Sequence, residues 1–187
     1  IEQIPHLNAK SGAPSGKNGF EIYSITGYFA KKLVHYENII SLQGSTIKGY
    51  SFPIIRMADL YLNYAEAANE VNGPSEDVYA MLNLVRERAG IKSVQESWGD
   101  ASISATLNKH TTVDGLRDII RQERLIEFAF EGHRYNDLRR WKMADEFLNS
   151  PVRGWSVDES IESDFYTLRD VGSRSFSSPR DYLHPIS

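Results

Sequence analysis

Cysteine is absent from the 187-residue sequence, and this absence excludes several kinds of chemistry. Without a thiol the chain forms no disulfide, offers no thiolate nucleophile or cysteine zinc site, and carries no lipidated cysteine within these residues. Long apolar runs are also absent, since no stretch approaches the roughly 18 residues that a membrane-crossing helix needs. The first residues lack the basic start and apolar core of a signal peptide. The sequence therefore predicts no membrane-embedded part within these residues.

A surplus of positive charge is missing as well, with 21 Lys and Arg against 25 Asp and Glu. This balance does not favour a nucleic-acid backbone as a partner. The five histidines show no metal-ligand spacing, and there is no EF-hand loop, glycine-rich phosphate loop or Gly-x-Ser-x-Gly elbow. We expect neither a metal nor a cofactor, and no nucleotide enzyme or serine hydrolase.

The length suits one domain or a large part of one, and the composition is that of a soluble globular protein. The chain begins at Ile1 without an initiator Met, and its end at 185–187 looks interrupted. We therefore expect a fragment of a longer protein. Three parts are predicted: loops and short strands over 1–52, a four-helix core over 53–149 and an irregular tail over 150–187.

The outer parts contain short segments that favour strands between glycines, serines and prolines. Aromatic and β-branched residues predict strands at 20–25 and 28–29, and a terminal strand is expected at 181–184.

The first two predicted helices form a hairpin. One runs from Pro53, in its first turn, to about Val71, and the other ends near Ala89, before Gly90. The first helix has an apolar face, which we expect to pack against a second helix because its alanines permit close approach. That face comprises Met57, Leu60, Tyr61, Tyr64, Ala65, Ala68 and Val71.

Two further helices are predicted beyond residues 91–112, a Ser- and Thr-rich segment that we interpret as a long exposed loop. The third helix runs from a cap at Thr111 or Thr112 to Gly132, and the fourth covers about 133–148. The fold class is thus mainly α. Its helical hairpins are similar to a tetratricopeptide-type array, without a second copy of the signature of about 34 residues. Long, irregular, aromatic-rich loops and a few short strands complete it.

Acids, bases and aromatics are concentrated at helical spacing over residues 123–141. Glu123 and Glu127 fall inside an apolar stripe of the third helix. The other members of this stripe are Leu116, Ile119, Ile120, Ile126 and Phe130. A buried carboxylate needs a cation, and Arg134, Arg139 and Arg140 follow closely, so we predict a buried Glu/Arg network.

A catalytic carboxylate pair is the alternative for Glu123 and Glu127, as in glycoside hydrolysis. Residues four apart on one helix face the same way, about 5–6 Å apart at Cβ, and cannot oppose each other across a bond. A hydrolase using Asp137 or Glu131 is the weakest hypothesis, because no opposed pair is identifiable. We therefore expect no enzyme.

Four segments together resemble the C-terminal portion of the RagB/SusD family of nutrient-binding outer-membrane lipoproteins. These are FPIIRMADLYLNYAEA at 52–67, LNLVRERAG at 82–90, ERLIEFAFEGHRYNDLRRW at 123–141 and YLHPI at 182–186. Their order and spacing carry the resemblance. The chain departs from the family in its length, since family members are generally far longer, and in His184, where an aromatic or aliphatic residue is more usual.

The resemblance implies a SusD-like, TPR-like fold and a surface-exposed binding protein of the outer membrane, without catalysis. Such a protein captures a nutrient, typically a glycan or oligosaccharide and sometimes a peptide, and delivers it to a SusC-like TonB-dependent transporter. The only membrane contact it implies is a lipid anchor outside this segment. The charged signature residues of 123–141 would then be scaffold.

Ligand-binding candidates are aromatic residues on polar loops, because aromatic faces stack on sugars. Trp98 stands alone in its predicted loop, and Trp155 follows Gly154 in a polar stretch. Weaker candidates are Tyr28, Tyr36, Tyr50 and Tyr166. Each could instead cover the helices from outside, since large aromatics are mostly buried. The alternative function is a helical-repeat scaffold that binds proteins through the concave faces of its hairpins.

Overall fold

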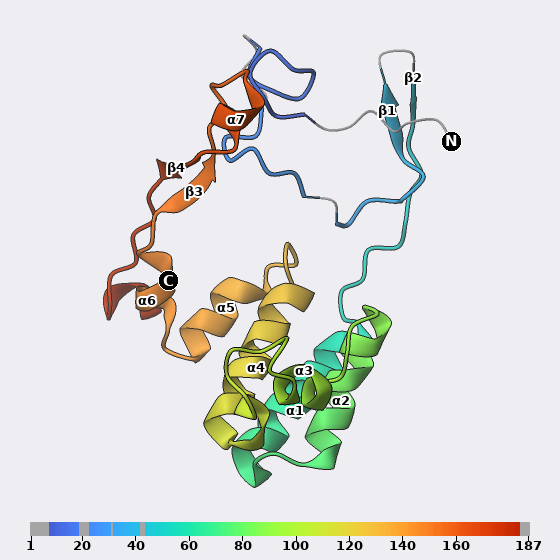
Figure 1. Ribbon diagram of the computed structural model, residues 1–187, viewed down its shortest axis with the longest axis vertical. Coiled ribbons are helices and arrows are strands. Elements are labelled where there is room, and N and C mark those ends of the chain that lie inside the picture. Colours follow the sequence, from blue (N-terminus) through green and yellow to red (C-terminus); the bar gives the residue numbers. More distant parts are fainter. Residues whose placement is uncertain (1–7, 19–22, 31, 42–43, 184–187) are drawn as a thin grey trace. The chain divides into compact units, whose positions relative to one another are not determined.

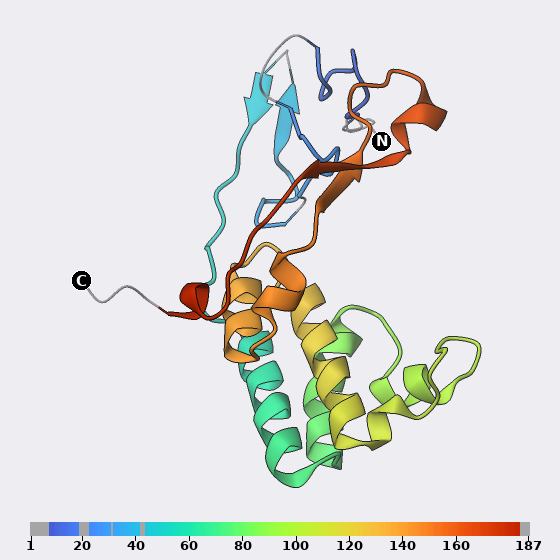
Figure 2. The same cartoon turned by 90° about the vertical axis from the view of Figure 1, so that its left-hand side faces the viewer.

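The computed structural model describes residues 8–18, 23–30, 32–41 and 44–183. These residues are mainly helical, with seven α-helices, two 3-10 helices and two pairs of short strands. The mainly α prediction is therefore confirmed. The chain forms two compact units, which we call the helical unit (52–134) and the loop-rich unit (1–51 with 135–187). Figures 1 and 2 show the elements of each unit.

The helical unit contains four α-helices and one 3-10 helix. These are α1 (Met57–Asn72), α2 (Glu76–Arg88), α3 (Val94–Gly99), η1 (Lys109–Thr111) and α4 (Val113–Glu127). Helices α1, α2 and α4 lie side by side (Figure 1). Their shared core is built around Leu62, Leu82 and Leu116, whose side chains are fully buried.

Local hydrogen bonds determine where these helices begin and end. The N–H of Arg56 donates to the Asp59 carboxylate at 2.9 Å, so α1 begins at Met57 and the prediction of a start at Pro53 was wrong. The predicted cap at Thr112 is confirmed, because its hydroxyl accepts from Gly115 N–H at 3.1 Å. Helix α4 ends at Glu127 rather than Gly132, since Phe130 has a φ of 65° that a continuing helix cannot accommodate.

The segment 91–112 is not the long loop that we predicted. It contains α3, which begins with a capping box in which the Ser93 hydroxyl accepts from Glu96 N–H and the Glu96 carboxylate accepts from Ser93 N–H. It also contains η1, which precedes the Thr112 cap.

The apolar face predicted for α1 is only partly the face that packs. The buried residues of the helix are Ala58, Asp59, Leu62, Ala65 and Asn69. The predicted face is instead largely exposed, at 56% for Met57, 54% for Leu60, 50% for Tyr64 and 81% for Val71. Only Ala65 of that face is fully buried. Helix α1 therefore has two apolar faces: the one with Ala58, Leu62 and Ala65 packs in the core, with Tyr61 and Ala68 at its edge, and the other is largely exposed.

The loop-rich unit contains short elements joined by long connections. They are β1 (Ile39–Ser41), β2 (Gly44–Thr46), most of α5 (His133–Arg140), α6 (Ala144–Leu148), β3 (Val152–Trp155), α7 (Glu162–Phe165), β4 (Leu168–Gly172) and η2 (Arg180–Tyr182). Strands β1 and β2 pair antiparallel, as do β3 and β4, in which Trp155 stands opposite Leu168. One small buried cluster surrounds Val157 and Phe165, and another surrounds Leu138 and Phe176.

Several predictions for this unit were wrong. The helix expected over 133–148 is divided into α5 and α6, because Lys142 adopts a φ of 58° and Met143 N–H donates back to the Leu138 carbonyl. Residues 23–25 and 28–29 form turns and extended chain rather than strands, and residues 20–22 lie outside the described chain. In place of the terminal strand the chain forms η2, and His184 lies outside the described residues. The division of the chain at residues 52 and 149 stays a prediction.

Candidate functional site

Trp155 lies at the end of β3, where the turn at 24–27 forms a hydrogen bond with the strand. Its N–H donates to the Thr26 carbonyl at 2.9 Å, and its ring packs against the cluster of Val157 and Phe165. The side chain is partly buried, so one part of the indole is anchored and the rest reaches the surface. Backbone and side-chain contacts together therefore fix the position of Trp155.

The turn at 24–27 approaches β3 closely because both chains have glycine at the contact. A Cβ added to Gly154 would lie 2.6 Å from Thr26 Cα, which no side chain can tolerate without movement of the backbone. Gly27 has a φ of 71°, and its N–H donates to the Ser24 carbonyl at 3.1 Å. The Ser24 hydroxyl then donates to the Tyr28 carbonyl at 2.8 Å, which places Tyr28 next to the strand.

Three aromatic rings meet at this point, and we call Tyr28, Trp155 and Tyr166 the aromatic cluster. The Tyr28 ring lies 5.6 Å from the Trp155 ring at an angle of 43°, and the Tyr166 ring lies 5.3 Å away at 87°. Such tilted and edge-to-face pairs are favourable aromatic geometries. Tyr28 is 52% exposed and Tyr166 is 57% exposed. The cluster therefore presents aromatic surface to solvent in two orientations.

Tyr166 is placed by the short helix α7. Its N–H donates to the Glu162 carbonyl at 3.2 Å, and the preceding Phe165 is buried. The Phe165 carbonyl also accepts from Ser156 N–H at 3.0 Å, which ties the end of α7 to the residue after Trp155. The ring of Tyr166 thus stands on backbone that is fixed on both sides.

Charged groups flank the same turn and strands. Asp158 accepts hydrogen bonds from Lys17 Nζ at 2.7 Å and from Arg169 Nη1 at 2.5 Å, and Arg169 stands opposite Gly154 in the β3–β4 ladder. These bonds, with that from Lys17 foremost, lower the pKa of the Asp158 carboxyl, and the same contact raises the pKa of Lys17. Exposed groups of both signs next to aromatic rings suit the recognition of polar, hydroxyl-rich ligands.

Trp98, the other predicted ligand residue, lies on α3 in the helical unit. Its ring is partly buried against the core of that unit, and Lys109 Nζ lies 5.6 Å from the ring centre. Its carbonyl accepts from Asn108 N–H at 2.8 Å. These contacts allow Trp98 a packing role, as well as a binding role for the part of the ring that remains accessible.

The weaker tyrosine candidates separate into two groups. Tyr28 and Tyr166 join Trp155, whereas Tyr36, 85% exposed, stacks on His35 and Tyr50 is 42% exposed. The sequence reasoning did not foresee the convergence on Trp155. A local signal was present, because Gly27-Tyr28 and Gly154-Trp155 are both glycine–aromatic pairs, and glycine permits close approach of two backbones.

A Glu/Arg ion-pair network forms around Glu123 and Glu127, as predicted, but its arginines are not the predicted Arg134, Arg139 and Arg140. Buried Glu123 pairs with Arg86 of α2, and Glu127 pairs with Arg56 and with Arg88, the latter at 2.6 Å. These arginines precede both glutamates by many residues in the sequence. The network joins α4 to α2 and to the start of α1, and it therefore stabilises the packing of these helices.

Glu131, one of the two acids considered for a hydrolase, forms an ion pair with Arg56. Arg56 Nε donates to one Glu131 oxygen at 2.9 Å and Nη2 to the other at 2.8 Å. Burial of Arg56 opposes its charge, but the hydrogen bonds that it donates to Glu131 and Glu127 outweigh this effect and raise the pKa of the guanidinium. The other proposed acid, Asp137, accepts from Arg140 Nε at 2.9 Å.

No cluster of three or more His, Asp or Glu side chains that could hold a metal ion occurs within the described ranges. Among the helices of the described chain, none is both long and apolar enough to cross a membrane.

Comparison with known proteins finds similarity to one family. Residues 3–187 match the SusD family. The SusD-like protein P2 of Formosa agariphila is 34% identical over 180 residues, which is 95% of this chain and 31% of that protein. A SusD-like protein of Bacteroides ovatus is 34% identical over 145 residues, covering 71% of this chain and 23% of that protein.

A solved structure described as selenomethionine BT4246 has a similar fold. It aligns with a TM-score of 0.69 and 30% sequence identity, covering 88% of this chain and 27% of that one. The 187 residues thus span less than a third of the length of each of these relatives.

Proposed function

Because the chain belongs to the SusD family, as its motifs predicted, we propose that it is part of a longer surface protein that captures a glycan or oligosaccharide. SusD family proteins are non-catalytic binding proteins and are typically surface-exposed outer-membrane lipoproteins. In this proposal the captured glycan passes to a SusC-like TonB-dependent transporter. The lipid anchor lies outside the 187 residues, which contain no cysteine.

The observation that supports glycan capture is the aromatic cluster. Sugars bind through stacking of their C–H faces on aromatic rings and through hydrogen bonds from their hydroxyls to polar groups. Tyr166 and Trp155 offer ring surfaces at 87° to each other, and a non-planar oligosaccharide can contact both. Their phenol and indole groups add hydrogen-bonding positions at the same place.

The cluster is also preorganised, which favours affinity. Tyr28 and Tyr166 stand on turns closed by backbone hydrogen bonds, and Trp155 lies in a paired strand. A ligand that binds such fixed rings loses less free energy to the ordering of side chains than one that must order a loop.

Trp98 remains a second predicted contact. It stands on an ordered helix with its ring under Lys109, so it would contribute at most one partly covered face. We therefore assign the main contact to Trp155 and its two tyrosine neighbours.

Affinity electrophoresis of the longer protein against plant, host and microbial glycans tests this proposal, followed by calorimetry with any glycan that retards it. Tyr166→Ala removes the most exposed ring of the cluster and should weaken binding by about tenfold or more, equivalent to about 1.4 kcal/mol. Trp155→Ala should weaken it further. Tyr36→Ala is the matched control, because Tyr36 is 85% exposed and stands outside the cluster.

Two results would contradict the proposal. If no glycan class retards the protein, capture of a peptide becomes the better hypothesis. If a glycan binds but Tyr166→Ala and Trp155→Ala leave its affinity unchanged, the site lies elsewhere and Trp98→Ala becomes the next variant to measure.

A further inference from the structure

The face of the β3–β4 hairpin that carries Trp155 also carries a pair of opposite charges (Figure 1). In the antiparallel ladder Trp155 stands opposite Leu168, and Arg153 stands opposite Asp170. Side chains two residues apart on a strand point to the same face, and residues paired across two strands share a face. The four side chains therefore lie on one face, as two successive cross-strand pairs.

The backbone hydrogen bonds bring these side chains close together. Trp155 N–H donates to the Thr26 carbonyl instead of to β4, so Trp155 and Leu168 form a non-hydrogen-bonded pair. In this type of pair the side chains across the ladder stand closest, and Arg153 with Asp170, two residues along each strand, repeats it. Two residues of a strand span about 6.7 Å, so the charged pair lies about one sugar unit from the indole.

The Arg153–Asp170 pair leaves hydrogen-bonding groups unused. Arg153 Nε lies 3.3 Å from one Asp170 oxygen, and the two side chains are 68% and 64% exposed. Among the described residues, neither the terminal guanidinium nitrogens of Arg153 nor the second Asp170 oxygen has a hydrogen-bond partner. Donors and an acceptor therefore face solvent on the same face as Trp155.

The other carboxylate beside the cluster, that of Asp158, is already occupied. One of its oxygens accepts from Lys17, and the other accepts from Arg169. Arg169 stands between the two pairs in the ladder, so its side chain belongs to the opposite face of the hairpin. Asp158 therefore supports the turn and the strands, and Asp170 is the carboxylate that can accept from a ligand.

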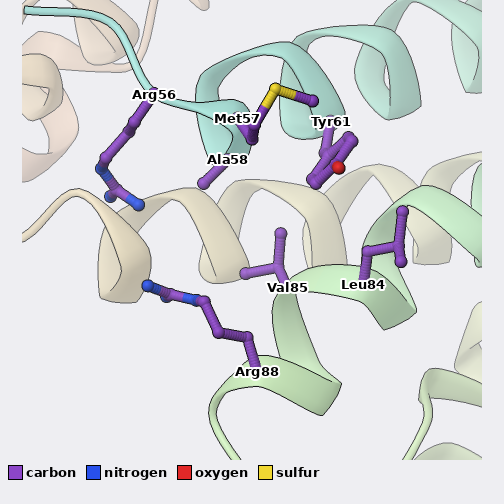
Figure 3. A pocket seen from close by; sticks show the side chains of 7 residues that line it. All are labelled: Arg56, Met57, Ala58, Tyr61, Leu84, Val85 and Arg88. Atoms are coloured by element: carbon purple, nitrogen blue, oxygen red, sulfur yellow. The ribbon is translucent and has the colours of Figure 1, made fainter.

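Arginines also line a pocket between α1 and α2 of the helical unit, but their groups are engaged. Figure 3 shows Arg56 and Arg88 beside apolar side chains of the two helices. Both arginines form ion pairs with Glu127. An arginine next to apolar surface is thus not by itself a ligand group. The unused terminal nitrogens of Arg153, close to aromatic rings, are what distinguish it.

We propose that Arg153 and Asp170 form the polar half of the glycan site and that they select a neutral oligosaccharide. In this inference, which rests on the proposed function, one sugar stacks on Trp155 or Tyr166. Hydroxyls of the next sugar accept from Arg153 and donate to Asp170. A sugar hydroxyl can do both, so neighbouring hydroxyls match a donor and an acceptor that stand side by side.

An acidic glycan is the poorer ligand for electrostatic reasons. A lone guanidinium would favour a carboxylate or sulfate, which it binds through two parallel hydrogen bonds. Asp170 balances this charge and repels an anion placed next to it. The described segments that build the cluster and its flanks, 8–18, 23–30 and 152–172, contain four basic and five acidic residues. They therefore add no positive surplus that would attract an acidic glycan.

Matched pairs of neutral and acidic glycans test the ligand class in the longer protein. The pairs are mannan with polymannuronate, glucan with polyglucuronate, and galactan with carrageenan, which is a sulfated galactan. Affinity electrophoresis identifies the pair that retards the protein, and calorimetry compares its two members. We expect the neutral member to bind about tenfold or more tightly than the acidic one.

Arg153→Met and Asp170→Asn test the two residues. Arg153→Met should weaken binding of the neutral glycan about tenfold, because it removes hydrogen bonds from a charged donor. Asp170→Asn should lower the preference for the neutral over the acidic member about tenfold, a change in selectivity that loss of a merely structural contact would not produce. Arg180→Met is the matched control, since Arg180 is 76% exposed and also pairs with an aspartate, Asp181. The urea midpoints should stay near that of the parent, because exposed ion pairs add little stability.

Three results would overturn the inference. Tighter binding of the acidic member of a pair contradicts the ligand class. If Tyr166→Ala weakens binding but Arg153→Met and Asp170→Asn both behave like Arg180→Met, the proposed function stands and these two residues are not part of the site. If no glycan retards the protein, the proposed function fails and this inference fails with it.

Discussion

The helical unit and the loop-rich unit both expose aromatic and apolar side chains, but they do so in different ways. In the helical unit the exposed residues, such as Leu60 and Tyr64, follow one face of a long helix. In the loop-rich unit Tyr28 and Tyr166 stand singly on turns and meet only through Trp155. Periodic exposure indicates a packing surface, whereas exposure on separate turns that converge indicates a ligand site.

The two units also differ in what stabilises them. Three long helices of the helical unit share one continuous core, and buried ion pairs join them. The loop-rich unit has two small clusters, around Val157 and around Leu138, and its turns are held by backbone hydrogen bonds. We therefore expect substitutions in the helical unit to affect the stability of folding and substitutions in the aromatic cluster to affect binding.

The largest expected effect is on the buried ion pair of the helical unit. Arg86→Met leaves the Glu123 carboxylate buried without this partner and should lower the free energy of unfolding by about 3 kcal/mol or more. Urea denaturation followed by circular dichroism measures it. The control Arg88→Met affects a side chain that is 62% exposed and should cost less than about 1 kcal/mol. Equal effects of the two variants would refute the structural role of the Glu123 pair.

The second effect tests the backbone contact that supports the aromatic cluster. Gly154→Ala forces the turn at Thr26 away from β3 and should cost about 1–3 kcal/mol, with a loss of glycan affinity. Gly172→Ala is a matched control in the partner strand, because a Cβ there meets nothing within 4 Å. Denaturation of both variants measures the loss of stability, and calorimetry measures the loss of glycan affinity. A Gly154→Ala protein that binds normally would show that the position of Tyr28 does not matter.

A smaller effect is expected at the start of α4. Thr112→Ala removes the hydroxyl that accepts from Gly115 N–H and should cost about 1 kcal/mol in unfolding free energy. Thr112→Ser retains the hydroxyl and should recover most of this loss. Glycan affinity should stay unchanged in both, and a change in affinity would count against the separation of roles between the two units.

The smallest effect concerns the polar face of α1 and depends on pH. A hydrogen bond from Arg117 lowers the pKa of the Glu70 carboxyl, so the pair stabilises the fold above the ordinary carboxyl pKa and this contribution is lost as pH falls. Because the side chains are partly exposed, Glu70→Gln should cost less than about 1 kcal/mol at pH 7. The urea midpoints of the variant and the parent should converge at low pH. A difference that persists in acid would assign the effect to something other than this ion pair.

Much of the helical unit was predictable because local rules decide it. Leu116, Ile119 and Ile120 are buried as the helical spacing predicted, and Thr112 caps α4. Ile126 and Phe130 of the same predicted stripe are exposed, because α4 ends at Glu127. The packed face of α1 was mispredicted because two faces of the helix carry apolar residues, and periodicity alone does not show which of them forms the core. The partners of Glu123 and Glu127 were missed for a related reason, since Arg56, Arg86 and Arg88 approach only through tertiary packing.

The candidate site was predictable only in part. Trp155 was selected because it follows a glycine in a polar stretch, and Tyr28 and Tyr166 were selected as weaker candidates. Their meeting depends on the turn at Thr26 docking against β3, a contact between segments far apart in sequence. No single-sequence pattern encodes that pairing, although the glycines at 27 and 154 permit it.

Tyr64 and Tyr166 provide the most direct test of the difference between the two units, because they are 50% and 57% exposed respectively. The measurement is the calorimetric affinity of Tyr64→Ala and Tyr166→Ala, in the longer protein, for a glycan that retards the parent. We predict that Tyr166→Ala weakens binding by about tenfold or more and that Tyr64→Ala leaves it unchanged. Loss of affinity in Tyr64→Ala, with normal binding by Tyr166→Ala, would contradict the assignment of the glycan site to the aromatic cluster.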